Sequence, residues 1–382
     1  MVIETEYYLN ILTILYENDF KQRGILKMKN LVILGGGYGG MKILNELLPN
    51  HLPEDVTITL VDRVPYHCLK TEYYALAAGT ISDKEVRVAF PEHPRLEVKY
   101  GEVTGIDTND RKIKMKDAEP LAYDDLIIGL GCEDKYHNVP GADQFTYSIQ
   151  SIEKARLTYS VLNNLGPGSV VGIVGAGLSG VELASELSES REDLNIKLFD
   201  RGKHILSAFP ERLSKYVENW FVRNNVEIIN NSNITKLEEN RLYNHDEPID
   251  CDVIVWTAGI QANEIVRNMN GEKDRLGRMI VTPHHHLPTD EHVFIVGDCA
   301  SSPHAPSAQL AEGQAEQIVE VLKKRWNGEE LPAAFPPIKL KGVLGSLGKK
   351  QGFGMMADRA ITGRVARLLK SGILWMYKFH NG

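Results

Sequence analysis

Long apolar runs, close cysteine pairs and a general excess of basic charge are all missing from this sequence. No stretch approaches the about 18 consecutive apolar residues of a membrane-spanning helix, which argues against an integral membrane protein. The 4 cysteines include no Cys-x-x-Cys pair, which argues against a zinc ribbon and against a thioredoxin-type disulfide. They are typical of reduced thiols in a cytosolic protein.

Acidic residues outnumber basic residues in most of the chain, but not at its end. The 382 residues carry 43 Lys and Arg against 51 Asp and Glu, a net charge of −8, so a general nucleic-acid binder is not expected. From residue 339 onward, nine basic residues accompany one acid; this tail is therefore +8 and the preceding 338 residues are −16. The asymmetry predicts either an anionic partner at the tail or a solvated basic helix.

Residues 1–27 lack the positive start and the apolar core of a signal peptide. Met28 stands directly before the first strand pattern, so we expect it to be the natural start and residues 1–27 to be an upstream extension. From there short apolar runs alternate with amphipathic stretches, which predicts an α/β fold with parallel sheets. The strand–helix–strand pattern occurs twice, at residues 31–34, 39–48 and 56–61, and again at residues 169–174, 180–188 and 195–199.

A glycine-rich loop of the G-x-G-x-x-G type joins the first strand to the first helix, at residues 35–40. Gly35 permits the tight turn, Gly37 lets the backbone approach a pyrophosphate, and Gly40 allows close packing of helix on strand. Asp62 ends the next strand, 22 residues past Gly40, where its carboxylate can accept hydrogen bonds from ribose hydroxyls. The loop therefore predicts a dinucleotide site.

The same pattern recurs 140 positions later, with Gly175, Gly177 and Gly180 in the loop and Asp200 at the end of the following strand. A carboxylate at this place repels a 2′-phosphate and favours NADH, whereas the neighbouring Arg201 leaves NADPH open. Two such sites in one chain predict FAD and NAD(P)H bound face to face. The flavin would accept a hydride and pass electrons to an acceptor that the two loops do not identify.

Five further segments resemble the type II NADH dehydrogenases, the single-subunit NADH:quinone oxidoreductases among the flavoproteins with two dinucleotide-binding domains. They are D-R-V-P-Y-H (62–67), N-V-P-G (138–141), G-V-E-L-A (180–184), V-W-T-A-G (255–259) and V-F-I-V-G-D-C-A (293–300). These motifs follow the order of that family between about residues 28 and 317.

The resemblance implies two Rossmann-like domains and a small C-terminal helical module. The FAD domain would comprise residues 28–140 and 266–337, with the NADH domain of residues 141–265 inserted and the module at residues 338–382. NADH would reduce FAD, and the electrons would pass to a quinone or similar acceptor without proton pumping. The resemblance places such an enzyme in the cytoplasm, on the inner face of the cell membrane, and leaves a homodimer open.

The resemblance also assigns roles to single residues. Asp298 would reach the ribityl chain of FAD, with a plain helix cap as the alternative. Glu182 would lie beside the junction of nicotinamide, flavin and quinone and assist proton transfer, or else only stabilise a helix N-terminus. Gln309 and Gln314 would contact the quinone, or else be helix-surface amides.

Two departures from the family pattern affect the expected acceptor. The quinone-side motif A-Q-x-A-x-Q-Q appears as A-Q-L-A-E-G-Q at residues 308–314, so Gly313 replaces a glutamine. The A-T-G of the family appears as G-L-G at residues 129–131. Quinone reduction is therefore an open expectation.

Two other function classes remain open. Cys68 lies where related peroxidases, oxidases and disulfide reductases carry a thiol near the flavin, so a peroxide or disulfide reductase is one alternative. Its bulky neighbours favour a packed, inert thiol. A non-enzymatic, flavin-bearing redox sensor is the other alternative. Residues 284–286 are all histidines, but neighbours on a strand point to opposite faces, so we expect an exposed turn and no metal site.

The basic tail has the pattern of an amphipathic helix over residues 359–382. One sector carries Ile361, Val365, Leu368, Leu369, Trp375, Met376 and Phe379, and the remaining arc carries Arg364, Arg367, Lys370 and Lys378. This pattern predicts docking on the headgroups of an anionic bilayer. A helix packed on the flavin domain or on a partner subunit, with its charges in water, is the alternative.

Overall fold

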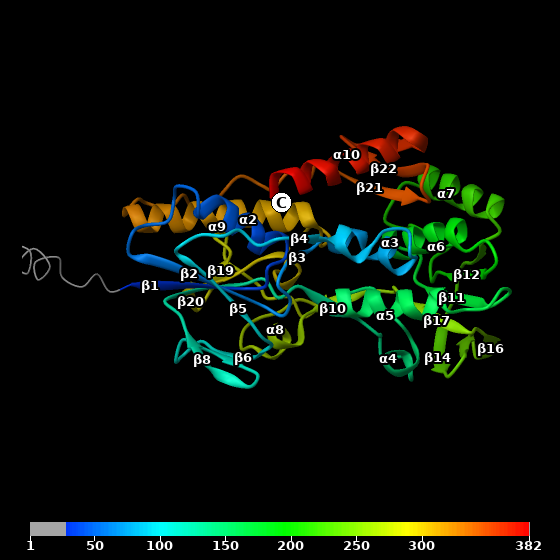
Figure 1. Cartoon of the computed structure of the whole chain (residues 1–382), viewed down its shortest axis with the longest axis horizontal. Helices are drawn as coiled ribbons and strands as arrows, with labels where there is room; N and C mark the ends of the chain where they lie inside the picture. Colours follow the sequence, from blue (N-terminus) through cyan, green and yellow to red (C-terminus); the bar gives the residue numbers. More distant parts are fainter. Residues whose placement is uncertain (1–27, 382) are drawn as a thin grey trace, which may run out of the picture.

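The computed structural model describes residues 28–381; the expectation about residues 1–27 lies outside this range (Figure 1). A six-stranded sheet lies at the centre of one half of the molecule, and its strands come from residues 29–128 and 286–295. Its strands are β1 Lys29–Leu34, β2 Val56–Asp62, β5 Leu96–Tyr100, β9 Asp125–Ile128, β19 His286–Leu287 and β20 Asp290–Ile295. They lie in the order β19-β20-β9-β1-β2-β5, and every pair except β19–β20 is parallel.

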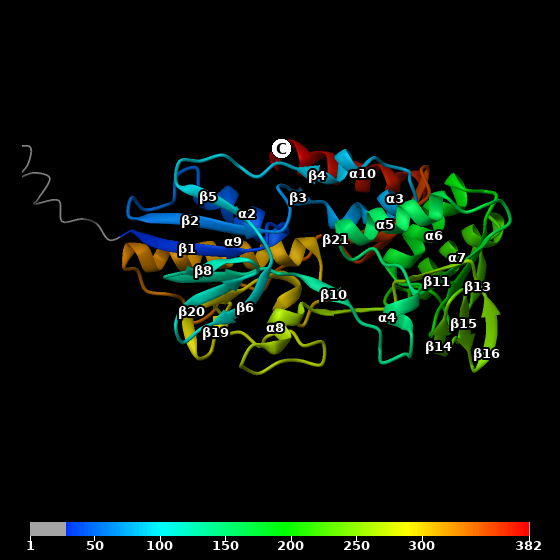
Figure 2. The same ribbon diagram turned by 60° about the horizontal axis from the view of Figure 1, so that its bottom comes forward.

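The side chains of β1 alternate between the two faces of this sheet, as the period of a strand requires. Leu31 and Ile33 belong to one buried cluster with helix α2 (Tyr38–Leu47), and α9 (Ala308–Asn327) packs beside α2. Val32 and Leu34 belong to a second cluster with Ile113 of a three-stranded antiparallel sheet. That small sheet consists of β6 Val103–Asp107, β7 Lys112–Met115 and β8 Ala118–Ala122. Figure 2 shows these layers.

The second half repeats this arrangement. Its parallel sheet has the order β13-β12-β11-β17 and comprises β11 Val170–Val174, β12 Asn195–Phe199, β13 Glu227–Ile229 and β17 Val253–Trp256. The helices are α6 Leu178–Ser190 and α7 Glu211–Arg223, and the antiparallel sheet on the other face comprises β14 Ile234–Glu238, β15 Arg241–Asn244 and β16 Glu247–Asp250. The duplication expected from the two glycine loops is therefore present in three dimensions.

Shorter elements join the halves. An antiparallel pair, β10 (Cys132–Asp134) and β18 (Ile260–Ala262), crosses between them. The other elements before the C-terminal module are β3 His67–Cys68, η1 Lys70–Glu72, α3 Tyr73–Ala77, η2 Asp83–Val86, β4 Arg87–Val88, α4 Ala142–Phe145, α5 Ile152–Asn163, α8 Glu264–Asn268 and η3 Gly297–Cys299.

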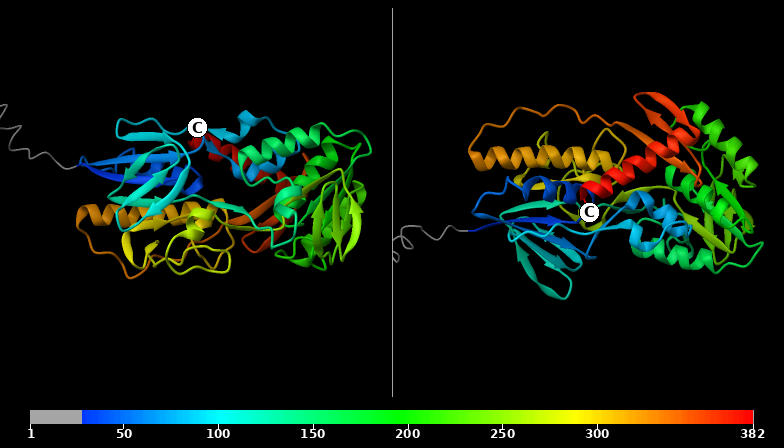
Figure 3. Two further views of the ribbon diagram at one scale, coloured as in Figure 1. Left: turned by 90° about the horizontal axis from the view of Figure 1, so that it is seen from below. Right: turned by 45° about the horizontal axis from the view of Figure 1, so that its top comes forward.

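The C-terminal module is more than the expected helix. A three-stranded antiparallel sheet comes first, with β21 Gly342–Leu347, β22 Gln351–Met356 and β23 Arg359–Thr362. Helix α10 (Gly363–Asn381) follows, so Ile361, expected on the helix, lies in a strand. Figure 3 shows α10 running from the neighbourhood of α6 and α7 toward α2. Among residues 28–381, none of the helices is long and apolar enough to cross a bilayer.

The histidine run does not form the exposed turn that we expected. His285 is 9% exposed, and its Nε2 lies 2.7 Å from Oε1 of Gln317. The rings of His284 and His286 stack with their centroids 6.1 Å apart. The turn is covered because His286 enters the sheet through β19 and His285 contacts Gln317 of α9. No cluster of metal-ligating side chains occurs in the part of the chain that the structure describes.

Candidate functional site

The first glycine loop has the geometry of a dinucleotide cradle. Gly35 has φ +96° and donates its N–H to the carbonyl of Val61 at 2.8 Å, which fixes the turn at the end of β1. A Cβ at Gly40 would overlap the carbonyl oxygen of Gly35, so the helix needs glycine there. A Cβ at Gly37, in contrast, would meet no atom within 4 Å, which leaves space for a phosphate beside the start of α2. The residues present thus fit the phosphates of FAD.

Asp62, at the end of β2, accepts hydrogen bonds from the main chain of this loop and of the segment after β2. Its Oδ2 accepts the N–H of Gly36 at 2.7 Å, and its Oδ1 accepts the N–H of Val64 at 3.0 Å. Burial raises the pKa of this carboxyl, although backbone N–H groups oppose the rise. Its expected bond to a ribose hydroxyl stays a prediction.

The second loop has the same construction. Gly175 has φ +104°, a Cβ at Gly180 would overlap the carbonyl of Gly175, and a Cβ at Gly177 would meet nothing within 4 Å. Asp200 accepts the N–H of Ala176 at 3.0 Å and the N–H of Gly202 at 2.7 Å. This loop fits the phosphates of a nicotinamide dinucleotide at the start of α6.

Asp298 lies inside the turn η3 at the end of β20. It therefore does not cap the turn, which contradicts the alternative reading. Its Oδ2 lies 3.8 Å from Nζ of Lys70, and the same ammonium donates to Sγ of Cys132 at 2.9 Å. The carboxylate is 21% exposed, so it keeps access to a ligand.

The two glutamines of the expected quinone motif both bind main chain. Oε1 of Gln314 accepts the N–H of Gly297 at 2.7 Å, and Gln314 is 2% exposed, so it is not a helix-surface amide. Gln309 donates from Nε2 to the carbonyl of Gly342 at 2.8 Å and accepts the N–H of Lys341 at 2.8 Å. Gln314 thus positions the turn that carries Asp298, and Gln309 positions the start of β21. Their contact with a quinone stays a prediction.

The departure at Gly313 has a steric reason. A Cβ at this position would lie 2.6 Å from Cγ2 of Ile338, in the segment that connects α9 to β21. The segment packs against α9 at this point, where the glutamine of the family would need room.

Glu182 is part of a buried polar cluster that also contains Lys370, Glu72, Tyr74 and Ser346. Its Oε1 pairs with the ammonium of Lys370 and accepts the N–H of Ser346 at 2.9 Å. Lys370 also donates to the hydroxyl of Tyr74 at 2.8 Å and lies 3.7 Å from Oε1 of Glu72. Tyr74 and Ser346 share a hydrogen bond of 3.0 Å between their hydroxyls.

Burial raises the pKa of Glu182 to about 7, although Lys370 opposes the rise. Burial lowers the pKa of Lys370, but the raising effect of Glu182, Tyr74 and Glu72 is larger and keeps it charged. Glu182 lies past the first turn of α6, so the alternative reading, in which it only stabilises a helix N-terminus, is wrong. The cluster holds two buried carboxylates against one ammonium, an arrangement that can store and release a proton near neutral pH.

The expectation that Lys370 lies on the solvent-facing arc of the C-terminal helix is wrong. Two carboxylates buried next to α10 need a cation, and Lys370 is the side chain that reaches them. A sequence signal existed: Ala366, Lys370, Leu374 and Tyr377 follow helical spacing, and the three apolar or aromatic members face inward. Glu72, Tyr74 and Ser346 carried no such signal, because they lie in segments without an assigned motif.

Cys68 and Cys132 are half-buried, and Cys251 and Cys299 are buried. Burial raises the pKa of Cys68 to about 11 and that of Cys132 to about 12. A nucleophilic cysteine needs the opposite shift. This geometry favours the packed, inert thiol that the neighbours of Cys68 suggested.

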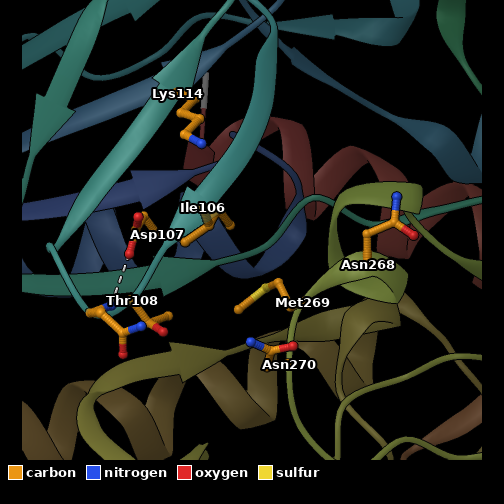
Figure 4. A pocket seen from close by; sticks show the side chains of 8 residues that line it. Ile106, Asp107, Thr108, Lys114, Asn268, Met269 and Asn270 are labelled. Carbon is orange, nitrogen blue, oxygen red and sulfur yellow. Dashed lines mark hydrogen bonds between the residues drawn. The ribbon is translucent and has the colours of Figure 1, made fainter.

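Two open hollows of about 240 Å³ each lie outside this cluster. Figure 4 shows the first, between the β6–β7 hairpin and α8, lined by Ile106, Asp107, Lys114, Asn268 and Met269 among others. None of the expected site residues lines it. The second lies in the segment after Asp200 and is lined by Lys203, His204 and Ser207 among others.

Comparison with known proteins agrees with this geometry. The pyridine nucleotide-disulphide oxidoreductase family matches residues 29–315. The chain belongs to this family. Membership confirms the predicted α/β fold class with two dinucleotide domains and an oxidoreductase enzyme. The predicted use of FAD with NADH agrees with membership of this family.

Three relatives illustrate the match. The NADH dehydrogenase-like protein YutJ of Bacillus subtilis is 69% identical over 355 residues, which cover 93% of this chain and 100% of that protein. A type II NADH:quinone oxidoreductase of Staphylococcus haemolyticus is 23% identical, covering 90% of this chain and 94% of that protein. The structure of NDH2 from Plasmodium falciparum in complex with NADH matches with a TM-score of 0.78 at 16% identity, covering 92% of this chain and 96% of that chain.

Proposed function

We propose that this protein is an NADH dehydrogenase that passes electrons from NADH to a quinone at a membrane surface, without proton pumping. The observation that carries the proposal is the buried Glu182–Lys370 pair. It follows the second glycine loop directly and links α6 to α10. The relative named NADH dehydrogenase-like protein supports NADH as the electron donor, and the relative named type II NADH:quinone oxidoreductase supports a quinone as the acceptor.

The chain supplies binding and orientation for the electron transfer. Gly37 and Gly177 leave room for the phosphates of the two dinucleotides, and Asp62 and Asp200 stand at the corresponding strand ends. When bound, FAD supplies the two-electron relay between the nicotinamide and the acceptor. Asp298, whose carboxylate is partly exposed and lies near Lys70, would bind the ribityl hydroxyls of FAD.

Glu182 supplies a proton. Reduction of a quinone to a quinol takes two electrons and two protons, and the hydride of NADH accounts for both electrons and one proton. A carboxyl with a pKa of about 7 is partly protonated at neutral pH and can give the second proton to the quinone oxygen. Lys370 then stabilises the carboxylate that remains, and Glu72 and Tyr74 hold Lys370 in place.

The outer face of α10 supports an approach to lipid. Six apolar side chains lie exposed there: Val365 59%, Leu368 71%, Ile373 48%, Trp375 64%, Met376 51% and Phe379 71%. The rings of Trp375 and Phe379 stack at 5.4 Å. Arg364, Lys349 and Lys350 add exposed positive charge on the same module. Such a surface suits the headgroup layer of an anionic bilayer, where a lipid-soluble quinone is found.

Stopped-flow reduction by NADH, followed by an acceptor screen, tests the catalytic proposal. We expect NADH to bleach the flavin and a water-soluble quinone to reoxidise it, both in the wild type and in Cys68→Ser. Turnover of peroxide or a disulfide that Cys68→Ser abolishes, without quinone turnover, would refute it. A flavin that NADH cannot bleach would instead indicate the sensor.

Liposome co-sedimentation tests the membrane docking. We expect the intact protein to bind vesicles with phosphatidylglycerol at low salt, to release at high salt, and to lose binding in Leu368→Ser/Trp375→Ser/Phe379→Ser. An exposed Leu157→Ser variant on α5 is the control and should bind like the wild type. An intact protein that stays in the supernatant, or that buries this face in a homodimer by sedimentation analysis, would refute the docking.

A further inference from the structure

Both main-chain groups of Gly36, in the first glycine loop, are held by side chains. The N–H of Gly36 is donated to Asp62 at 2.7 Å, and the carbonyl of Gly36 lies 2.8 Å from Nδ1 of His67. The carbonyl of Gly36 and the N–H of Gly37 belong to one planar trans peptide and therefore point in opposite directions. Anchoring the carbonyl to His67 directs the N–H of Gly37 away from His67, at the glycine that borders open space.

The partners of His67 fix its tautomer. A carbonyl can only accept, so Nδ1 carries the hydrogen and Nε2 is left as an acceptor. The hydroxyl of Tyr377 lies 3.0 Å from this Nε2 and donates to it. His67 is fully buried, and this burial lowers its pKa to about 4, which keeps the imidazole neutral at physiological pH.

Tyr377 brings the C-terminal helix into this arrangement. It lies on the inner side of α10, two turns past Lys370, and 310 residues from His67. Tyr38, which follows Gly37, packs against both rings, with centroids 4.9 Å from His67 and 5.3 Å from Tyr377. The hydroxyl of Tyr38 shares a hydrogen bond of 3.0 Å with that of Thr71. The end of α10 thus covers the FAD loop.

The second loop provides an internal comparison. Its equivalent carbonyl, that of Ala176, accepts the main-chain N–H of Leu206 at 2.9 Å. This bond lies within the NADH half and involves no residue of α10. In the described part of the chain, only the first of these two glycine-loop carbonyls is therefore connected to α10, through the side chains of His67 and Tyr377.

We propose that Tyr377 and His67 are positioning residues for FAD, which orient the Gly36–Gly37 peptide toward the phosphates so that helix α10 determines how firmly the flavin is held. Tyr377 acts through the hydrogen bond to His67. The proposal rests on FAD binding at the first loop and is independent of the electron acceptor.

The test measures FAD release from the purified holoenzyme, by the fluorescence of freed flavin after dilution. Tyr377→Phe removes one hydrogen bond to a buried ring, and we expect release to be about 5–10-fold faster, which corresponds to about 1–1.4 kcal/mol. Tyr216→Phe is the matched control, because its hydroxyl donates to Gln351 of the same C-terminal module at 2.9 Å. The control should release FAD at the wild-type rate, and the KM for NADH should be unchanged in both variants.

A double-mutant cycle separates positioning from a general loosening of the fold. We expect His67→Phe to accelerate release at least as much as Tyr377→Phe, and the double variant to equal His67→Phe alone. If His67→Phe does not fold, the comparison of the FAD release rates of Tyr377→Phe and Tyr216→Phe decides whether the proposal holds. The proposal would be overturned if Tyr377→Phe released FAD at the wild-type rate, or if the two substitutions had additive effects on the release rate in the double variant. A parallel rise in the KM for NADH would also overturn it.

Discussion

The two glycine loops share one local design and differ in what surrounds them. Both have a first glycine with positive φ, a second beside open space and a third pressed on the first, and both strands end in an aspartate that accepts loop N–H groups. Two residues past the third glycine, however, the first helix carries Lys42 and the second carries Glu182. Lys42 pairs with Glu46 and Glu316 at the surface, whereas Glu182 is buried against Lys370. The loop determines what can bind, and the surroundings determine the chemistry available next to it.

The largest expected effect comes from removing Lys370. A buried carboxylate pair left without its cation should cost about 3–5 kcal/mol of the free energy of unfolding. We expect Lys370→Met to show this loss in urea unfolding, and Glu182→Gln/Lys370→Met to recover part of it. Lys42→Met, at the equivalent position of the first loop, should change stability by less than about 1 kcal/mol. An equal loss of unfolding free energy in both lysine variants would contradict the proposed difference between the surroundings of the two loops.

Glu182→Gln should mainly affect the acceptor half of the reaction. Loss of a positioned acid is expected to slow quinone reduction by about 100-fold, while reduction of the flavin by NADH stays within about 2-fold. Rapid-mixing measurements of the two half-reactions give both numbers. A similar loss in the NADH half-reaction would instead assign Glu182 to cofactor binding.

The pH dependence follows from the raised pKa of Glu182, about 7. The carboxyl is protonated below that pH, so the rate of quinone reduction should be high at acidic pH and fall as pH rises through about 7. In Glu182→Gln this limb should be absent. Rates measured from pH 5.5 to 8.5 check this, and a limb that persists in the variant would belong to another group.

Asp298→Ala should weaken flavin retention, because a hydrogen bond from the carboxylate to the ribityl chain is lost. For a charged acceptor the loss is about 1.5–3 kcal/mol, or roughly 10–150-fold in the dissociation constant of FAD. Asp193→Ala, an exposed acid before β12, serves as the control. Unchanged FAD content after dialysis would remove Asp298 from the flavin site.

The smallest effect is expected at Asp200. Its carboxylate should bind the adenosine ribose of NADH and repel a 2′-phosphate, so Asp200→Ser should narrow the kcat/KM ratio of NADH to NADPH by about 10-fold. Asp62→Ser, its counterpart in the first loop, should leave that ratio unchanged. An unchanged ratio in Asp200→Ser would point to Arg201 as the selecting residue.

Local patterns alone predicted most of the fold. Apolar runs followed by G-x-G-x-x-G loops predicted strands at residues 31–34 and 169–174 and helices directly after them, and the structure confirms these elements within one or two residues. The period of a strand is two residues and that of a helix is about 3.6, and a tight turn restricts only a few neighbouring residues. These signals are therefore visible in the sequence itself. The C-terminal sheet was missed because Gly342–Leu347 and Gln351–Met356 are glycine-rich strands with weak alternation.

The sequence by itself determined the two dinucleotide cradles and the acids at their strand ends. Only the tertiary structure decided the partners of Glu182 and of the Gly36 carbonyl: Lys370 lies 188 residues from Glu182, and Tyr377 lies 310 residues from His67. The amphipathic pattern of α10 placed Lys370 in water, because helical periodicity describes one helix and not the charges buried next to it. Ile338 against Gly313 is another such case. Desolvation and steric exclusion depend on what the rest of the chain brings to a site, and this is the physical reason why those contacts required the folded molecule.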